Sequence, residues 1–230
     1  MRRYAVLGMI GLAASGAWAQ QATPPAQPPT SATSDPSSKA VVAMESPQAG
    51  DYWNYEVRDE ITGKITATRS NVVTEVSEKD ISLRFSVTGT SNEGLSIYDR
   101  SWNVLKSGAW KYTPNDGTGF PTPLTIGKAW SFQGNDVNAG NGFTWSRSGR
   151  SKVVGQETVT TKAGAFETFK IETTISSRNA KDPTMKTETA TVTRYAPAID
   201  HWVKRTFVLR VDDHLRDNNT SELVGYGRRQ

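Results

Sequence analysis

The chain offers few residues that could perform acid–base or nucleophilic chemistry. It has no cysteine and only two histidines, His201 and His214. A serine hydrolase needs a histidine beside an activated serine, often in a Gly-x-Ser-x-Gly turn. The nearest segment, Ser146-Arg147-Ser148-Gly149, lacks the leading glycine. We therefore predict no catalytic residue, and we expect His201 to be a structural hydrogen-bonding residue.

Two short segments carry groups that bind metal ions in other proteins. Asp212-Asp213-His214 offers oxygen and nitrogen ligands. Adjacent side chains of a strand point to opposite faces, so a solvated turn is expected there. Asp136-Val137-Asn138 resembles the start of a calcium loop, but Gly140 and Arg147 stand where that loop needs an Asp or Asn and a bidentate Glu. The sequence predicts no metal site and no cofactor.

Carboxylates suited to glycoside chemistry are present but unpaired in the sequence. Asp59-Glu60, Glu167 and Glu172 are available, and nothing singles out two that share a cleft. A hydrolase of envelope glycans or lipids, using loop carboxylates with His201, therefore stays an alternative.

Aromatic side chains are the distinctive feature of the chain. They could line an apolar cup for a lipid or stack on sugar rings, or they could fill the core of a domain that is short of leucine. The residues that we predict to line a ligand site are Trp53, Tyr55, Trp110, Tyr112, Trp130 and Trp145.

The elements that must position these rings are strands. Side chains that are mostly apolar occupy every second position of 81–87, 169–175 and 203–211, and Arg205 interrupts the last of these faces. A period of two is typical of a strand with one buried face. Turn residues such as Thr62-Gly63 separate about ten to twelve such segments.

Consecutive hairpins build a meander, and a long meander must curl or close to protect its edges. We therefore predict an all-β fold, an antiparallel meander that forms a strongly curved sheet or an incomplete barrel. A two-sheet sandwich is the alternative.

The start of the chain predicts export. Arg2 and Arg3 precede a short apolar run, and Ala17-Trp18-Ala19 provides a signal-peptidase site. We expect cleavage after Ala19 and a periplasmic or secreted product. Residues 20–46, rich in Pro, Ser and Thr at their start, predict a disordered spacer, and residues 47–230 predict one β-rich domain.

Charge argues against two classes of partner. Loss of Arg2 and Arg3 lowers the formal net charge from +4 to +2. A charge this small, spread over a domain, does not indicate binding to nucleic acid or to a membrane surface. No later segment is apolar enough to span a membrane.

Three segments together resemble a known group. They are Phe120–Trp130, which is similar to an "FPLxVGKxW" box, Lys162–Glu172, similar to "vPAGxFxxxKIE", and Tyr195–Lys204, similar to "WYxPxxgxxVK"; Glu222-Leu223-Val224 is similar to a closing "ELV" strand. In this order they resemble uncharacterised exported bacterial β-domains that are domain of unknown function 3108-like. The resemblance covers roughly the C-terminal half and implies a curved antiparallel sheet in the cell envelope, with no established activity.

The sequence favours a non-enzymatic envelope protein that binds an apolar or amphipathic ligand or a protein partner. That partner would be a lipid, a glycan or an envelope protein. The alternatives are the envelope hydrolase and a purely structural interaction module tethered by the spacer.

Overall fold

The computed structural model describes residues 41–229. The predicted signal peptide and residues 20–40 of the predicted spacer lie outside the described residues. In the part of the chain that is described, no helix is long and apolar enough to cross a membrane.

The described chain is built almost entirely from strands, as the alternation of its apolar residues predicts. One 3-10 turn, η1 (Pro197–Ile199), interrupts them. The strands are β1 (Asp51–Asp59), β2 (Ile65–Val76), β3 (Asp80–Val87), β4 (Glu93–Asp99), β5 (Val104–Ser107), β6 (Trp110–Thr113), β7 (Ala129–Asn138), β8 (Thr144–Thr161), β9 (Gly164–Asn179), β10 (Lys186–Ala196), β11 (His201–Val211) and β12 (His214–Arg228).

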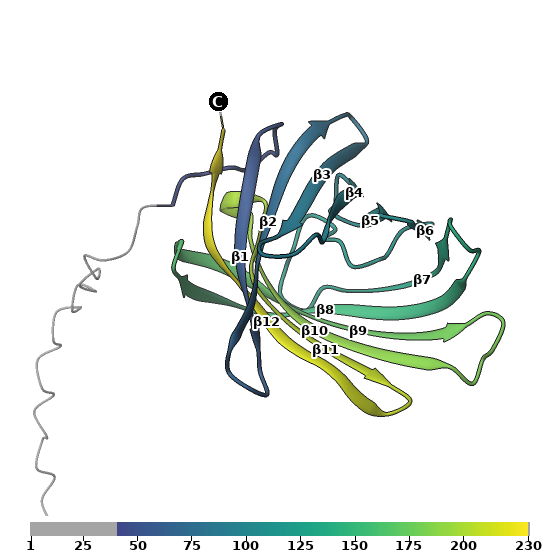
Figure 1. Cartoon of the computed structure of the whole chain (residues 1–230). Helices are drawn as coiled ribbons and strands as arrows, with labels where there is room; N and C mark the ends of the chain where they lie inside the picture. Colours follow the sequence, from purple (N-terminus) through teal and green to yellow (C-terminus); the bar gives the residue numbers. More distant parts are fainter. Residues whose placement is uncertain (1–40, 230) are drawn as a thin grey trace, which may run out of the picture. The chain divides into compact units, whose positions relative to one another are not determined.

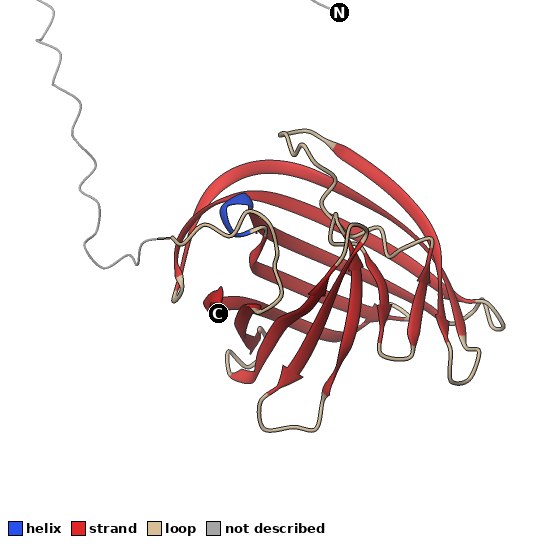
Figure 2. Cartoon of the chain, turned by 90° about the horizontal axis from the view of Figure 1, so that it is seen from above, coloured by secondary structure: helices blue, strands red, loops and turns tan. Residues whose placement is uncertain are grey.

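The strands form a closed antiparallel barrel (Figures 1 and 2). Each strand pairs with the next one along the chain, and β1 pairs with β12 from Asp51↔Arg228 to Asp59↔Asn219. The predicted antiparallel meander is thus confirmed. The sheet goes further than a curved sheet or an incomplete barrel, because pairing of the first and last strands leaves neither with an open edge. An ion pair of 2.6 Å between Arg228 Nε and Asp51 Oδ1 lies at this closure.

The wall of the barrel is uneven in length. β8 and β9 have 18 and 16 residues, whereas β5 and β6 have four each. Register shifts, such as the one between Val153 and Gly155 of β8, mark bulges that increase local bend and twist. The long strands therefore extend beyond the short ones and curve around the interior.

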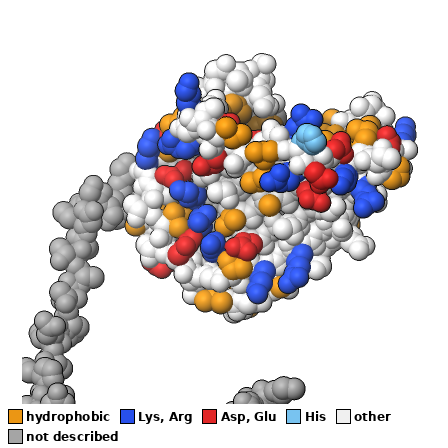
Figure 3. Space-filling model, turned by 90° about the horizontal axis from the view of Figure 1, so that it is seen from below, with side chains coloured by type: hydrophobic (Ala, Val, Ile, Leu, Met, Phe, Trp, Pro, Cys, Tyr) orange, Lys and Arg blue, Asp and Glu red, His pale blue; other side chains and the backbone are white. Residues whose placement is uncertain are grey.

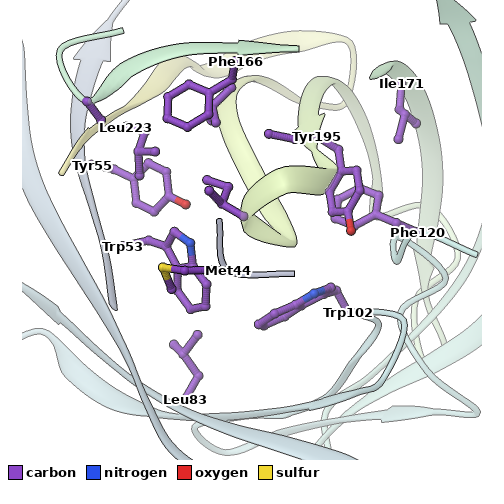
Figure 4. Packing of buried hydrophobic residues seen from close by; sticks show 14 of the residues in the cluster. Met44, Trp53, Tyr55, Leu83, Trp102, Phe120, Phe166, Ile171, Tyr195 and Leu223 are labelled. Atoms are coloured by element: carbon purple, nitrogen blue, oxygen red, sulfur yellow. The ribbon is translucent and has the colours of Figure 1, made fainter. Parts of the chain in front are cut away.

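An apolar core fills part of the interior (Figure 4). Trp53 and Tyr55 of β1 are fully buried, together with Val203 and Leu223 from β11 and β12. These side chains occupy the inward positions that the period of two assigns to them.

Two segments outside the sheet close this core. In the loop between β6 and β7, Phe120 is 4% exposed, and its ring lies 4.5 Å from that of Tyr195, measured between centroids (Figure 4). Ahead of β1, Met44 is buried, and its backbone N–H donates to the carbonyl of Ala198 at 2.7 Å. The sequence predicts that the folded domain starts at residue 47. In the structure it starts earlier, because the apolar side chain of Met44 packs in the core.

Candidate ligand-binding site inside the barrel

Part of the barrel interior outside this core is hollow. An open cavity of about 480 Å³ lies where β7–β11 extend past the core, within the size range of small-molecule sites. Its lining comes from the six strands β6–β11 and from the β6–β7 loop. The lining residues are Trp110, Tyr112, Asp116, Thr118, Asp136, Trp145, Arg147, Ile175, Ser177, Thr187, Thr189 and Phe207.

Three of the predicted ligand-lining residues meet at this cavity. Trp110 and Tyr112 occupy alternate positions of β6, so both point inward, and Trp145 begins the inward face of β8. All three are partly exposed. Phe207 of β11 adds a fourth ring to the lining. These rings are therefore not fully buried in the core, and part of their surface is accessible to a ligand.

Arg147 holds the cavity wall together. It is 8% exposed and its Nε lies 3.2 Å from Asp136 Oδ1 on the neighbouring strand β7. Its Nη2 donates to the carbonyl of Asn115 at 2.7 Å, and its guanidinium lies 5.0 Å from the centre of the Tyr112 ring. One cation therefore joins β6, β7, β8 and the β6–β7 loop.

Burial raises the pKa values of the acidic groups of this wall. Desolvation raises the pKa of Asp136 to about 6, against the opposing effect of Arg147. Desolvation, with the nearby Asp136 and Asp116 carboxylates, raises the pKa of Tyr112 to about 12, so its phenol keeps its proton. The wall therefore combines a polar rim, which includes the Arg147–Asp136 ion pair, with an aromatic surface.

A smaller hollow of about 140 Å³ lies deeper in the barrel and shares Asp116 and Thr118 with the first. Arg69 of β2 and Arg205 of β11 line it, with Tyr98 and Trp102 among the aromatic neighbours. The two hollows adjoin at these shared loop residues and together make up the candidate site.

His201 sits at the wall of the smaller hollow. Its ring centre lies 4.3 Å from that of Trp53 and 4.6 Å from that of Trp102. Burial lowers its pKa well below the usual value, Arg205 and Arg69 lower it further, and the backbone of Asp200 acts in the other direction. Neither ring nitrogen has hydrogen-bond geometry with a described residue. The expectation of a hydrogen-bonding His201 therefore differs from the structure, where aromatic packing holds the ring.

The other three predicted ligand-lining residues do not line the hollows but contact residues that form or position the walls of the site. Trp53 and Tyr55 are fully buried in the core and do not line either hollow. Tyr55 stacks on Trp202 at 3.8 Å between ring centres, and Trp202 lines the smaller hollow. Trp130 of β7 donates from Nε1 to the carbonyl of Gly117 at 3.2 Å, which fixes the β6–β7 loop.

Sequence reasoning missed the charged residues of the site. Three of them, Arg69, Arg147 and Asp136, occupy inward positions of their strands. The sequence pattern of these strands does not indicate that a charged side chain points inward. Arg205 is different, because it visibly interrupts an apolar face. That interruption is the one signal that could have placed a cation inside the barrel.

A larger hollow of about 780 Å³ lies on the outer face of β7–β11. Most of its side chains, such as Ser148, Thr174 and Ser176, are short and polar and alternate with the inward ones. Phe132, the one aromatic residue in its lining, lies at an inward position and packs against Gly117 of the β6–β7 loop. The face seen from below likewise shows charges of both signs interspersed, without a large apolar patch (Figure 3). The interior, with its converging rings and inward-facing cations, has the stronger features of a binding site.

Among the described residues, no group of three or more His, Asp or Glu side chains is placed to hold a metal ion. The Asp212-Asp213 pair forms the tight turn between β11 and β12, both residues having positive φ. His214 is exposed and its Nδ1 lies 2.8 Å from the carbonyl oxygen of Asp212.

Comparison with known proteins identifies the fold. No protein-family model matches the chain, and no curated protein matches it in sequence. A candidate lipoprotein of Parabacteroides distasonis is similar in structure, with a TM-score of 0.57, 13% identity, and coverage of 82% of this chain and 100% of that one. A candidate exported protein of Bacteroides fragilis, described as having a YmcC-like fold, has a TM-score of 0.52, 15% identity and coverage of 82% and 100%. The hypothetical lipoprotein YmcC of Escherichia coli gives a TM-score of 0.46 at 10% identity, covering 75% and 83%. The chain thus shares its fold with the first two proteins.

Proposed function

We propose that this chain is an exported protein of the cell envelope that binds an apolar or amphipathic ligand inside its barrel, without catalysing a reaction. The observation that carries the proposal is the convergence of Trp110, Tyr112 and Trp145 on one open cavity of about 480 Å³. Aromatic rings that stay partly exposed around a cavity give a ligand a large apolar contact, and their polar edges orient it.

Placement in the envelope rests on independent support. The N-terminal residues have the pattern of a signal peptide. Two proteins of the same fold are described as a lipoprotein and as an exported protein. Both lines of support favour an extracytoplasmic ligand such as a lipid or a glycan.

We also propose kinship with the exported β-domains that the sequence resembles. The resembling segments fall at structural corners of this barrel. Phe120–Trp130 forms most of the β6–β7 loop, Lys162–Glu172 begins at the β8–β9 turn, and Tyr195–Lys204 spans η1. Segments of this kind define a scaffold, which supports a shared fold more than a shared ligand.

The test is to purify the full chain after export and to measure its mass under native conditions, followed by solvent extraction. A stoichiometric lipid or glycan adduct is expected. Bare protein that also fails to bind added amphiphiles would contradict the proposal and leave the structural interaction module. A glycan- or lipid-hydrolysing activity that His201→Ala abolishes would replace it with the hydrolase.

A matched pair of variants tests the site itself. Trp110→Ala removes a ring from the cavity, whereas Lys111→Ala changes the next residue of the same strand, which is exposed. We expect ligand retention to fall in the first variant and to stay unchanged in the second. Equal ligand retention in the two variants would indicate that the ligand binds outside this cavity.

A further inference from the structure

The smaller hollow contains two arginines that the cavity wall does not neutralise. Arg69 and Arg205 reach it from β2 and β11, two strands separated in the barrel by β1 and β12. Among the described residues, no carboxylate oxygen lies within 4.0 Å of either guanidinium. Arg147, the third inward arginine, differs because Asp136 pairs with it.

Both guanidinium groups keep most of their hydrogen-bonding capacity. Arg69 Nε donates to Asn71 Oδ1 at 3.0 Å, and Arg205 Nε donates to Thr193 Oγ1 at 3.1 Å. Within the described residues, the terminal Nη atoms of both make no hydrogen bond. A guanidinium has five N–H donors, so two unoccupied edges face the same small hollow.

Aromatic rings hold the two cations in place. The Arg205 guanidinium lies 4.8 Å from the centre of the Trp202 ring, and that of Arg69 lies 5.0 Å from the centre of the Phe85 ring. Stacking occupies the planar face of a guanidinium and leaves its edge available for a carboxylate or a phosphate. Because the guanidinium groups are already oriented, less side-chain entropy is lost when an anion binds.

The acidic residue of this hollow is already engaged. Asp116 accepts hydrogen bonds from the backbone N–H groups of Val104 and Thr118 and from the Thr118 hydroxyl. Burial raises its pKa, which favours the neutral form. Asp116 therefore stabilises the β6–β7 loop and does not act as a close counter-ion for the arginines.

Arg69 and Arg205 are partly exposed to the hollow, and two like charges that face one hollow repel each other unless an anion joins them. Burial lowers the pKa of Arg205; the nearby Tyr98, Tyr55 and Asp116 oppose this shift, and the charge of Arg69 adds a smaller lowering effect. A volume of about 140 Å³ is close to that of an engineered cavity that holds benzene, which is roughly 150 Å³. The hollow thus has room for a small head group, and the aromatic cavity beside it has room for a chain.

We propose that Arg69 and Arg205 form an anion subsite, so that the ligand is an amphiphile whose carboxylate or phosphate head lies between them while its apolar chain lies against Trp110, Tyr112 and Trp145. This inference rests on the proposed function and names the chemical class of the ligand.

The test uses the full chain and probes that share one apolar tail: decanoate, decyl phosphate and decanol. Acetate and inorganic phosphate serve as heads without a tail. Tryptophan fluorescence and calorimetry give the dissociation constants. We expect each decyl anion to bind about tenfold to hundredfold more tightly than decanol, as expected for charge-assisted hydrogen bonds.

Each result decides something different. Equal binding of decanol and the decyl anions would overturn the anion subsite while supporting the proposed function. Inorganic phosphate that binds as tightly as decyl phosphate would overturn the amphiphile and indicate a plain anion site. Absence of binding by every probe would overturn both the subsite and the proposed function.

Variants locate the subsite. We expect Arg205→Gln and Arg69→Gln each to reduce the preference for anion over alcohol by about tenfold. Arg210→Gln removes the same charge from the outer face of β11 and should leave the preference unchanged. Loss of preference in Arg210→Gln alone would refute the assignment. If the interior variants fail to fold, the preference of the unaltered protein among the probes still decides the question.

Discussion

The ring of Phe132 is wedged between two glycines, and this contact makes a quantitative prediction. A Cβ added to Gly149 of β8 would lie 2.2 Å from Phe132 Cζ, and one added to Gly117 of the β6–β7 loop would lie 2.0 Å from Phe132 Cγ. Carbon atoms in contact prefer separations of about 3.5 Å or more. In Gly149→Ala the ring would therefore have to move by more than about 1 Å, toward a loop that already blocks it.

Two opposing effects set the size of the change. Overpacking of this kind costs about 1–3 kcal/mol, and Gly149 has no positive φ to add strain. Replacing glycine by alanine in a strand otherwise stabilises by roughly 0.5–1 kcal/mol, because the unfolded chain loses freedom. We expect Gly149→Ala to lower the free energy of unfolding by about 1–2 kcal/mol.

A double-mutant cycle isolates the cause. Phe132→Leu removes the ring atoms nearest to Gly149. In that background Gly149→Ala should become neutral or slightly stabilising, which gives a coupling energy of about 1–2 kcal/mol. Gly155→Ala is the control on the same strand, since a Cβ there meets no atom within 4 Å. Urea unfolding followed by circular dichroism measures all variants. An equal cost of Gly149→Ala in both backgrounds would refute the steric reasoning.

Three further predictions concern the core and the cavity wall. Ser151→Ala should lower the free energy of unfolding by about 1–2 kcal/mol, because it removes the buried hydrogen bond of 2.8 Å between Ser151 and Thr173. Adding Thr173→Val should restore most of the lost stability, as measured by urea unfolding. A double variant no more stable than Ser151→Ala would contradict this prediction. Trp53→Ala should cost about 3–5 kcal/mol, since that side chain is fully buried, and an unchanged unfolding midpoint would place it outside the core. The pKa of Asp136, raised by burial to about 6, means that the folded state retains a proton that the unfolded chain loses, so the stability due to this group falls as pH rises from about 4 to about 6. Relative to Asp136→Asn, the unaltered protein should therefore lose about 1 kcal/mol between about pH 4 and about pH 7, after allowance for solvent screening; a gain over that interval would reverse the sign of the argument.

Closure of the barrel shows where sequence reasoning stops. The alternation in 81–87 and 203–211 predicts strands locally, because side chains in a strand have a period of two. The pairing of β1 with β12 joins Asp51 to Arg228 across almost the whole domain. No local pattern encodes that register, so the sequence could not distinguish a closed barrel from a curved sheet.

The candidate site divides in the same way. Trp53 and Trp110 are both inward residues of strands, and the sequence predicts both as ligand-lining. Their depth along the barrel separates them, since Trp53 lies in the filled part and Trp110 lines the open cavity. Depth depends on the uneven strand lengths and on the β6–β7 loop, which only the folded chain defines.

The antiparallel meander and the wealth of aromatic side chains follow from residue types and their spacing, so the amino-acid sequence predicts both. Which rings remain exposed to a cavity, and which cations have no nearby carboxylate, depends on the folded barrel. Arg69 and Arg205 lie far apart in the chain and share one hollow only because the barrel closes. A charge can bind a ligand when its surroundings orient it and supply no counter-ion, and that condition belongs to the assembled fold.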